Sequence, residues 1–232
     1  MENVLDNPVY HALISGDAHL AGGNNVARYF EPEVSPFAGF PIGYNNGFND
    51  LLNELPADRR ILFASITPVE HKGWQQAAYI QGSQFVFDTN RSTVPGDEML
   101  MNSISIVPLT ASNAEEMVAL AALTKPGPFD RRTIEFGSYH GVFENGKLAA
   151  MTGQRLHPFD HTELSAVCTH PDFLGRGYAT ALLVHQLKII LQTGKTPFLH
   201  VRSDNARAIA VYERLGFTLR SPMHFYFLKR AV

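Results

Sequence analysis

A turn with two glycines, residues 174–180 (LGRGYAT), restricts the fold of this chain most strongly, because it joins a strand-like segment to a long helical one. Gly175 and Gly177 allow turn conformations without a Cβ clash, so successive N–H groups up to Thr180 can point into one concavity at a helix N-terminus. The helix dipole adds partial positive charge there, and Arg176 and the Thr180 hydroxyl supply further donors. The turn therefore predicts a pyrophosphate site, with a plain tight turn as the alternative for so short a motif.

The segments around this turn predict an α/β unit of layered α+β type over residues 103–232. Apolar residues recur along the helix that follows the turn with the 3.6-residue period of one buried face. Asn145 and Gly146 suit a type I′ hairpin between two strands. Strands are expected at 104–109, 139–144, 147–156, 162–169, 197–202 and 223–228, and helices from a Ser112–Glu115 capping box to the residue before Lys125, after Gly177 to about Gln192, and at 205–215. The resulting order, βαβββαβαβ, indicates a layer sandwich.

The first 95 residues are punctuated by glycine and proline. Eight of these residues fall between Ala21 and Asp50 and break any regular element into short pieces. Strand-like runs appear only at 61–66 and 85–88. Residues 89–102 are polar, contain Pro95 and Gly96, and are typical of a linker. The sequence therefore predicts an N-terminal accessory domain, 1–95, and a second domain, 103–232.

Composition narrows the classes of ligand. The 232 residues carry 19 basic and 22 acidic side chains, a net charge of −3, and show no basic run, which argues against a nucleic-acid partner. No apolar stretch approaches about 18 residues and the first residues are polar and acidic, so we expect neither a membrane span nor a cleavable signal. One cysteine, Cys168, permits no intrachain disulfide and fits a cytoplasmic protein. A small-molecule ligand is the expectation that remains.

Two other groups of reactive side chains have simpler interpretations. His157, Asp160 and His161 form a short His/Asp cluster, but one cysteine and no HExxH motif favour a polar hairpin loop over a metal site. Cys168 alternates away from Val167 along its strand, so a small buried strand residue is favoured over a nucleophile. We expect no metal.

A second ligand face is predicted on the helix at 205–215. Asn205 and Tyr212 lie seven residues apart, which is about 700° of rotation and roughly 10 Å of rise, so they share a face along which an extended ligand could lie. The alternatives are that Asn205 only caps the helix and that Tyr212 is a half-buried core aromatic.

These two segments together resemble a known family. Residues 167–183 (VCTHPDFLGRGYATALL) resemble the acetyl-CoA signature of the GNAT acetyltransferase superfamily, and residues 199–217 resemble its second signature in the expected order and spacing. Residues 163–169 and 196–201 resemble most the glycine N-acyltransferase-like branch. Leu174 departs from the pattern, since Arg or Gln is usual there, and the loss of that side chain is expected to weaken cofactor binding modestly.

The resemblance implies a GNAT-type mixed, mostly antiparallel central sheet flanked by helices, with 103–232 as the catalytic domain and 1–95 as a degenerate copy of the fold. It implies that the strand at 163–169 splays from that at 197–202 and admits the thioester arm of acetyl-CoA, with main-chain pairing to the pantetheine. The cofactor-binding residues that it implies are Val167, Thr169, Gly175, Arg176, Gly177, Tyr178, Ala179, Thr180, Asn205 and Ala208.

The resemblance also implies the catalytic groups. Tyr212 would protonate the departing thiolate, and Glu163 would act as the general base that deprotonates the acceptor amine. Glu163 shares a face with Val167 and Thr169 by strand alternation, unless a bulge resets it; an exposed strand-end glutamate is the alternative. His200 is a second candidate base, and a packed strand histidine is its stronger interpretation.

The expected function is transfer of an acetyl group from acetyl-CoA to a primary amine of a small molecule, directly in a ternary complex. The alternative is a catalytically weak or inactive CoA-binding module. We expect the N-terminal 95 residues and the loop at 124–129 (TKPGPF) to shape the acceptor pocket. The expected partners are a small-molecule amine and no nucleic acid or membrane, with the chain a monomer or homodimer.

Overall fold

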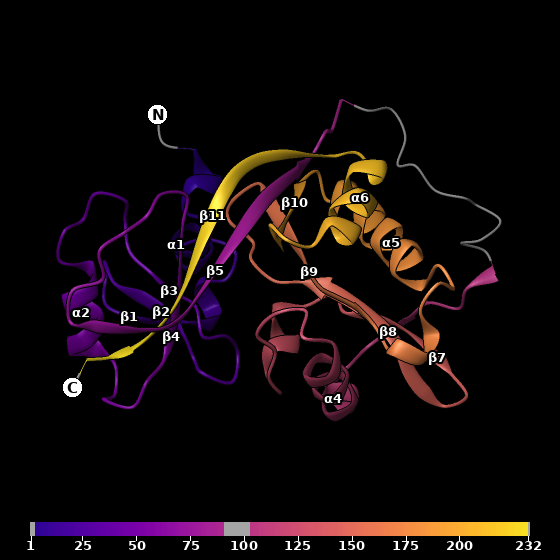
Figure 1. Ribbon diagram of the computed structural model, residues 1–232, viewed down its shortest axis with the longest axis horizontal. Coiled ribbons are helices and arrows are strands. Elements are labelled where there is room, and N and C mark those ends of the chain that lie inside the picture. The colour runs from indigo at the N-terminus through magenta and orange to yellow at the C-terminus, as the bar shows by residue number, and fades with distance from the viewer. Residues whose placement is uncertain (1–2, 91–102, 232) are drawn as a thin grey trace.

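A computed structural model describes residues 3–90 and 103–231, and an eight-stranded sheet runs through both parts (Figure 1). The strand order is β4-β11-β5-β10-β9-β8-β7-β6, and a separate three-stranded sheet has the order β1-β2-β3. Most of the expected linker, and the domain boundary between residues 95 and 103, lie outside the described residues. Within the described ranges no helix has the length and apolar character needed to cross a membrane.

The second half of the chain follows the predicted order of elements. The elements are β6 (Val107–Pro108), α4 (Ala114–Thr124), β7 (His140–Glu144), β8 (Lys147–Gln154), β9 (His161–Thr169), α5 (Tyr178–Gln192), β10 (Thr196–Arg202), α6 (Ala206–Leu215) and β11 (Phe217–Arg230). Positive φ angles of 51° at Asn145 and 75° at Gly146 confirm the predicted hairpin turn between β7 and β8. The sheet is mixed and mostly antiparallel, as expected, with β9 and β10 parallel.

Two local predictions in this half were wrong. The strand expected at 104–109 shrinks to the two residues of β6. The capping box before α4 pairs Thr110 with Asn113 rather than Ser112 with Glu115, because a 3-10 turn, η3 (Ala111–Asn113), precedes the helix and moves its entry toward the N-terminus.

The N-terminal half contributes short elements and two strands of the large sheet. Its elements are η1 (Val4–Asp6), α1 (Pro8–Leu13), η2 (Ala18–Leu20), β1 (Ala21–Gly23), β2 (Arg28–Phe30), β3 (Ala38–Gly39), α2 (Gly47–Glu54), β4 (Ile61–Ser65) and β5 (Trp74–Phe87). The short elements around the many Gly and Pro residues agree with the sequence. β5 differs from the prediction, because the sequence indicated a strand only over its last residues, at 85–88.

β5 is the strand that joins the two halves. It has 14 residues and pairs antiparallel with β11 over its whole length and with β10 over its second part. Figure 1 shows β5 and β11 as two long ribbons that run side by side from the N-terminal elements to α5 and α6. Residues 75–79 of β5 are exposed and lack the alternation of a half-buried strand, which is why the sequence did not reveal them. The sheet is therefore continuous across the predicted domain division.

Apolar clusters cover the sheet at three places. α5 and α6 pack on β9, β10 and β5 through Leu183, Leu187 and Tyr212. α4 packs on β8 and β9 through Met117 and Leu120. The N-terminal elements pack on β10 and β11 in a cluster that contains Leu5, Val9, Phe30, Phe37, Leu62, Phe198 and Met223. The N-terminal half thus lies against the strands that bound the candidate site.

Candidate active site

The gap between β9 and β10 originates in a bulge. The two strands pair in parallel only from His161 and Thr196 to Leu164 and Leu199. Ala166 has a φ of 52°, and the pairing of β9 with β8 shifts register there, so β9 carries one extra residue. Beyond the last pair, residues 165–169 and 200–202 line one cleft. The predicted splay of the two strands is confirmed.

The cleft has a volume of about 780 Å³ and is bounded by both halves of the chain. One side consists of residues 173–180 and one face of α6. The opposite side is an apolar wall of Phe37, Leu62, Ile80, Phe225 and Phe227. Residues 124–128 of the TKPGPF loop complete the lining. All ten predicted cofactor-binding residues and Tyr212 lie along this cleft, whereas Glu163 is not among its lining residues.

The glycine turn has the expected geometry. Gly175 and Gly177 have φ angles of 80° and 79°, a region that L side chains rarely adopt, and Gly177 is the N-cap of α5. A Cβ on Gly175 would meet no atom within 4 Å, so the turn borders open space. The first backbone N–H groups of α5 have no acceptor within the helix, as in any α-helix, and they lie beside the cleft. This arrangement suits an anionic ligand.

Side chains of the turn are partly held by β7. The Tyr178 hydroxyl donates to Glu144 Oε2 at 2.7 Å, and Arg176 Nη1 lies 3.6 Å from Glu144 Oε1. Leu174 is half exposed at the rim of the cleft.

The positions of Asn205 and Tyr212 agree with both interpretations given for them: the two residues line the cleft, and they also serve as a helix cap and a buried aromatic. Asn205 caps α6, since its Oδ1 accepts from the Ala208 amide at 3.1 Å, and its side-chain NH₂ is not part of that bond. Tyr212 is buried, with its ring edge-on to Phe217. Burial raises the pKa of Tyr212 to about 12, so its phenol stays neutral and can donate a proton.

Sequence reasoning missed several cations of the cleft. Arg207 and Arg214 on α6 are seven residues apart, the same spacing that singled out Asn205 and Tyr212, so the signal was present. Within the described residues the cleft lining includes no Asp or Glu. Its basic residues are Lys125, Arg155, Arg176, Arg202, Arg207 and Arg214. Arg155, Arg176 and Arg202 are paired with carboxylates outside the lining, so the local positive charge that suits a polyanionic ligand comes mainly from Lys125, Arg207 and Arg214.

Glu163 lies on the other side of β9 from the cofactor residues. The bulge resets the alternation, so Val167 packs toward α5 while Glu163 turns to Arg155 and His200. Arg155 Nε and Nη2 donate to the two Glu163 oxygens at 2.8 and 2.6 Å, and the Glu163 side chain is fully buried. Both predictions for Glu163 were therefore wrong: it does not share a face with Val167, and it is not an exposed residue at a strand end.

The surroundings of Glu163 argue against its predicted role as general base. Burial alone would raise the pKa of Glu163, but the charge of Arg155 and hydrogen bonds from Arg155 and His200 outweigh it and bring the pKa to about 2. A carboxylate that acidic is a poor acceptor for the proton of an ammonium group.

The second candidate base is also engaged. His200 Nδ1 lies 2.7 Å from Glu163 Oε1, and its Nε2 lies 3.0 Å from Gln84 Nε2, which is a donor only. Both ring nitrogens of His200 are therefore engaged, Nδ1 with Glu163 and Nε2 with the Gln84 amide. The packed strand histidine is the interpretation that fits.

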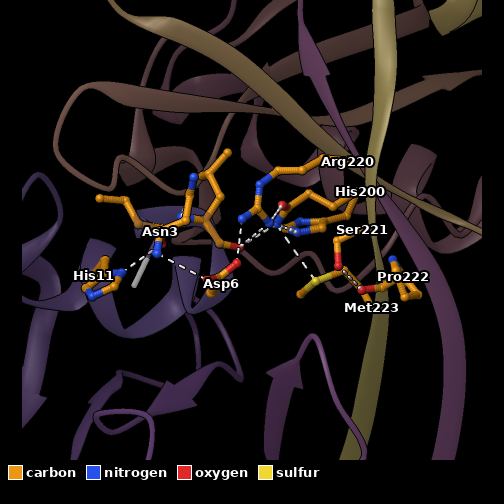
Figure 2. Close-up of polar contacts among 11 residues, drawn as sticks. Asn3, Asp6, His11, His200, Arg220, Ser221, Pro222 and Met223 are labelled. Atoms are coloured by element: carbon orange, nitrogen blue, oxygen red, sulfur yellow. Dashed lines mark hydrogen bonds and ion pairs between the residues drawn. The ribbon is translucent and has the colours of Figure 1, made fainter. Parts of the chain in front are cut away.

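The same network ties the N-terminus to the sheet. Gln84 Oε1 accepts from Arg220 at 2.8 Å, and Arg220 also bonds Asp6. Figure 2 shows Arg220 between Asp6 and His200, so η1 is connected to β5, β10 and β11. The orientation of the Glu163 and His200 side chains is thus fixed by residues that lie far away in sequence.

Cys168 and the His/Asp cluster have structural surroundings. Cys168 is buried against α4, and burial raises the pKa of its thiol to about 11, which does not favour a nucleophile. His157 binds Asp17 of the N-terminal half through Nδ1 at 2.7 Å. In the part of the chain that the structure describes, no three His, Cys, Asp or Glu side chains are grouped to hold a metal ion.

A cationic cleft between splayed strands, with a glycine turn at a helix N-terminus, is suited to an extended anionic ligand. The FR47-like protein family matches residues 139–227. A crystal structure described as a GNAT-family acetyltransferase, from Novosphingobium aromaticivorans, is 32% identical over 100% of both chains, with a TM-score of 0.88. The chain therefore belongs to the GNAT acetyltransferase family, whose co-substrate is acetyl-CoA.

Curated relatives match part of the chain. The ribosomal protein bS18-alanine N-acetyltransferase of Escherichia coli K12 is 39% identical over 75 residues, which are 32% of this chain and 50% of that protein. The chain thus spans about half the length of this relative. The Salmonella typhimurium protein of the same name is 34% identical over 125 residues, 50% of this chain and 81% of that protein. A GCN5-related N-acetyltransferase from Kribbella flavida shares the fold, with a TM-score of 0.65 at 14% identity over 93% of each chain.

Proposed function

We propose that this protein transfers the acetyl group of acetyl-CoA to a primary amine of a small molecule, by direct attack in a ternary complex. The observation that carries the proposal is that one cleft joins the glycine turn, the gap between β9 and β10, and the apolar wall. The cofactor and an acceptor can therefore be bound at the same time. In this assignment the turn and α6 form the cofactor side, and the apolar wall with residues 124–128 forms the acceptor side.

The chemistry at the gap uses main-chain and aromatic groups. Backbone groups of Val167 and Thr169 would pair with the pantetheine, and an N–H near Val167 would bind the thioester oxygen as negative charge develops on it. The Tyr212 phenol, kept neutral by burial, would protonate the departing thiolate.

Proton removal from the amine is favoured by the field of the cleft. No carboxylate lines it among the described residues, and Lys125, Arg207 and Arg214 disfavour the ammonium form of an acceptor, whereas Arg155, Arg176 and Arg202 are paired with carboxylates. An amine whose pKa is already about 8, as for the α-amino group of a peptide or an amino-acid amide, loses its proton most readily, and water can receive that proton. This supports an α-amine as the acceptor.

A second candidate acceptor is the N-terminal amine of a protein. It is favoured by the match to enzymes named for acetylation of an alanine of ribosomal protein bS18. The finer resemblance to the glycine N-acyltransferase-like branch rests on residues 163–169 and 196–201 alone, and the relatives reported above belong to another group of acetyltransferases.

The test combines binding and turnover. A thermal-shift titration with acetyl-CoA should give a saturable rise, since ligand at about 100 times Kd adds roughly 2.7 kcal/mol. Thiol release is then followed with amino acids, alkylamines and N-terminal peptides as acceptors. A shift without turnover for any amine would support the CoA-binding module instead, and no shift at millimolar acetyl-CoA would refute both.

A further inference from the structure

Arg155 has one half of its guanidinium in use and the other half beside the cleft. Nε and Nη2 form the bidentate pair with Glu163. Within residues 3–90 and 103–231, no hydrogen bond involves Nη1. Arg155 lines the cleft, and its Nη1 lies 3.9 Å from where a Cβ on Gly127 would be. The free donor edge therefore faces the loop at 124–128.

This guanidinium is held rigidly. Its carbon lies 4.9 Å from the centroid of the Phe37 ring, and the Glu163 pair locks its plane. His200 in turn holds Glu163, and it is linked through Gln84 to Arg220, which connects the ion pair to β10, β5 and β11. A planar donor fixed on both sides is suited to recognise an oxygen at a defined position rather than to attract charge from a distance.

A second donor without a partner lies behind the same loop. Tyr139 is buried, and its hydroxyl has no hydrogen-bond partner among the described residues. Tyr139 borders a small void whose lining also includes residues 126–128, Ser165 and Ala166, all of which line the cleft. The void is too small for a water molecule, so among the residues that the structure describes the Tyr139 hydroxyl is an unsatisfied buried donor behind the loop, and Arg155 is the donor that faces the cleft itself.

We infer that Arg155 Nη1 binds the carbonyl or carboxylate oxygen next to the acceptor's amine, which makes Arg155 the residue that selects α-amino acids, their amides or N-terminal residues over simple alkylamines. The inference rests on the proposed function and names the acceptor class for that site. The apolar wall, with Ile80, Phe225 and Phe227, would then contact the apolar side chain of the acceptor.

Four acceptors with one side chain test this selection. L-leucinamide, L-leucine and the tripeptide Leu-Gly-Gly carry the oxygen, and 3-methylbutylamine lacks it. Rates are referred to the concentration of neutral amine, because the α-amino group of a peptide or an amino-acid amide has a pKa of about 8, whereas a free amino acid and an alkylamine titrate nearer to about 10. One hydrogen bond to a charged group predicts that kcat/KM for leucinamide exceeds that for 3-methylbutylamine by about tenfold to a hundredfold. Equal rates for the two amines would overturn the inference, and the free acid and tripeptide arms identify which source of the oxygen is used.

The variant R155K keeps the charge beside Glu163 but replaces the planar donor by a point donor. It should reduce the leucinamide preference to within about threefold while the thermal shift with acetyl-CoA is kept. R132K is the matched control, because Arg132 pairs with Glu135 on the surface outside the cleft, and it should retain the wild-type preference. A wild-type preference in folded R155K would refute the role of Arg155.

A binding measurement on the wild-type chain keeps the test independent of turnover and of the stability of R155K. In ¹⁵N-labelled protein saturated with CoA, the side-chain Nη signals of the buried arginine should shift with leucinamide and not with 3-methylbutylamine. A shift without thiol release would refute the proposed function and support the inference. Thiol release without such a shift would support the proposed function and refute the role of Arg155.

Discussion

The two sides of the cleft are built in different ways. The cofactor side consists of two short sequence segments, the turn at 174–180 and the face of α6, with a local cap at Asn205 and one longer-range partner, Glu144, for Arg176 and Tyr178. The acceptor side combines residues from β3, β4, β5, β8, β10 and β11 or their flanks, around a buried ion pair. We therefore expect the cofactor side to depend mainly on its own two segments, and the acceptor side to depend on every strand that contributes to it.

Removal of the N-terminal half should have the largest effect. A chain beginning at Asn102 lacks β5, so β10 and β11 lose their shared partner and the cluster around Phe198 and Met223 loses its cover. We expect a chain without a cooperative thermal transition by circular dichroism, and coexpression with residues 1–90 should restore one. A soluble, cooperatively folded fragment that still binds acetyl-CoA would show that the two sides are separable after all.

The substitution E163Q should come next in size. It leaves the buried Arg155 guanidinium without its counter-charge, which typically costs about 3–5 kcal/mol, measured as the urea dependence of unfolding. E135Q is the matched control: it breaks the exposed pair with Arg132 and should change stability by less than about 1 kcal/mol. A similar loss of unfolding free energy in both variants would show that the buried ion pair contributes no more to stability than the exposed one.

The same pair predicts a pH dependence. The folded-state pKa of Glu163, about 2, lies below its ordinary value of 4.5, so its contribution is complete above about pH 4.5 and is lost as the pH falls toward 2. The contribution is on the order of 3 kcal/mol. The difference in Tm between the wild-type protein and E163Q should therefore shrink between pH 5 and pH 3; a constant difference would contradict the ionised, paired state.

Y212F tests the cofactor side at the chemical step. Loss of the proton donor should lower kcat by about 10²–10⁴ while the thermal shift with acetyl-CoA stays the same. Because the pKa of Tyr212 is about 12, the phenol stays protonated up to at least pH 10, so wild-type turnover should show no loss from this group below that pH. Unchanged turnover in Y212F would remove Tyr212 from the mechanism.

The smallest effect is expected for G175A, compared with G146A. Both glycines have a φ near 80° and open space at the Cβ position, so each alanine should cost about 1–2 kcal/mol of backbone strain and no clash. Only Gly175 borders the cleft. G175A alone should weaken acetyl-CoA binding, by a few-fold in a titration. Equal binding in both variants would place the anion site elsewhere.

The sequence by itself determined the elements whose cause is local. The Asn145–Gly146 hairpin, the glycine turn before α5, the Asn205 cap and the period of α5 each depend on residues within one or two turns of chain, and all of them occur in the structure. The cofactor side could be predicted because its residues lie in two such segments. Arg207 and Arg214 could have been found by the same spacing rule.

Tertiary structure alone decided the acceptor side. The exposed half of β5 has no hydrophobic period, so its place beside β11 follows only from the pairing of strands that are distant in sequence. The position of Glu163 relative to the cofactor residues depended on a one-residue bulge at Ala166, which no pattern of alternation reveals and which places Val167 on the opposite face of β9 from Glu163. The enclosed Arg155 guanidinium then fixed the charge of Glu163, because its charge and hydrogen bonds outweigh the effect of burial and keep the carboxylate ionised, which makes it a weak base.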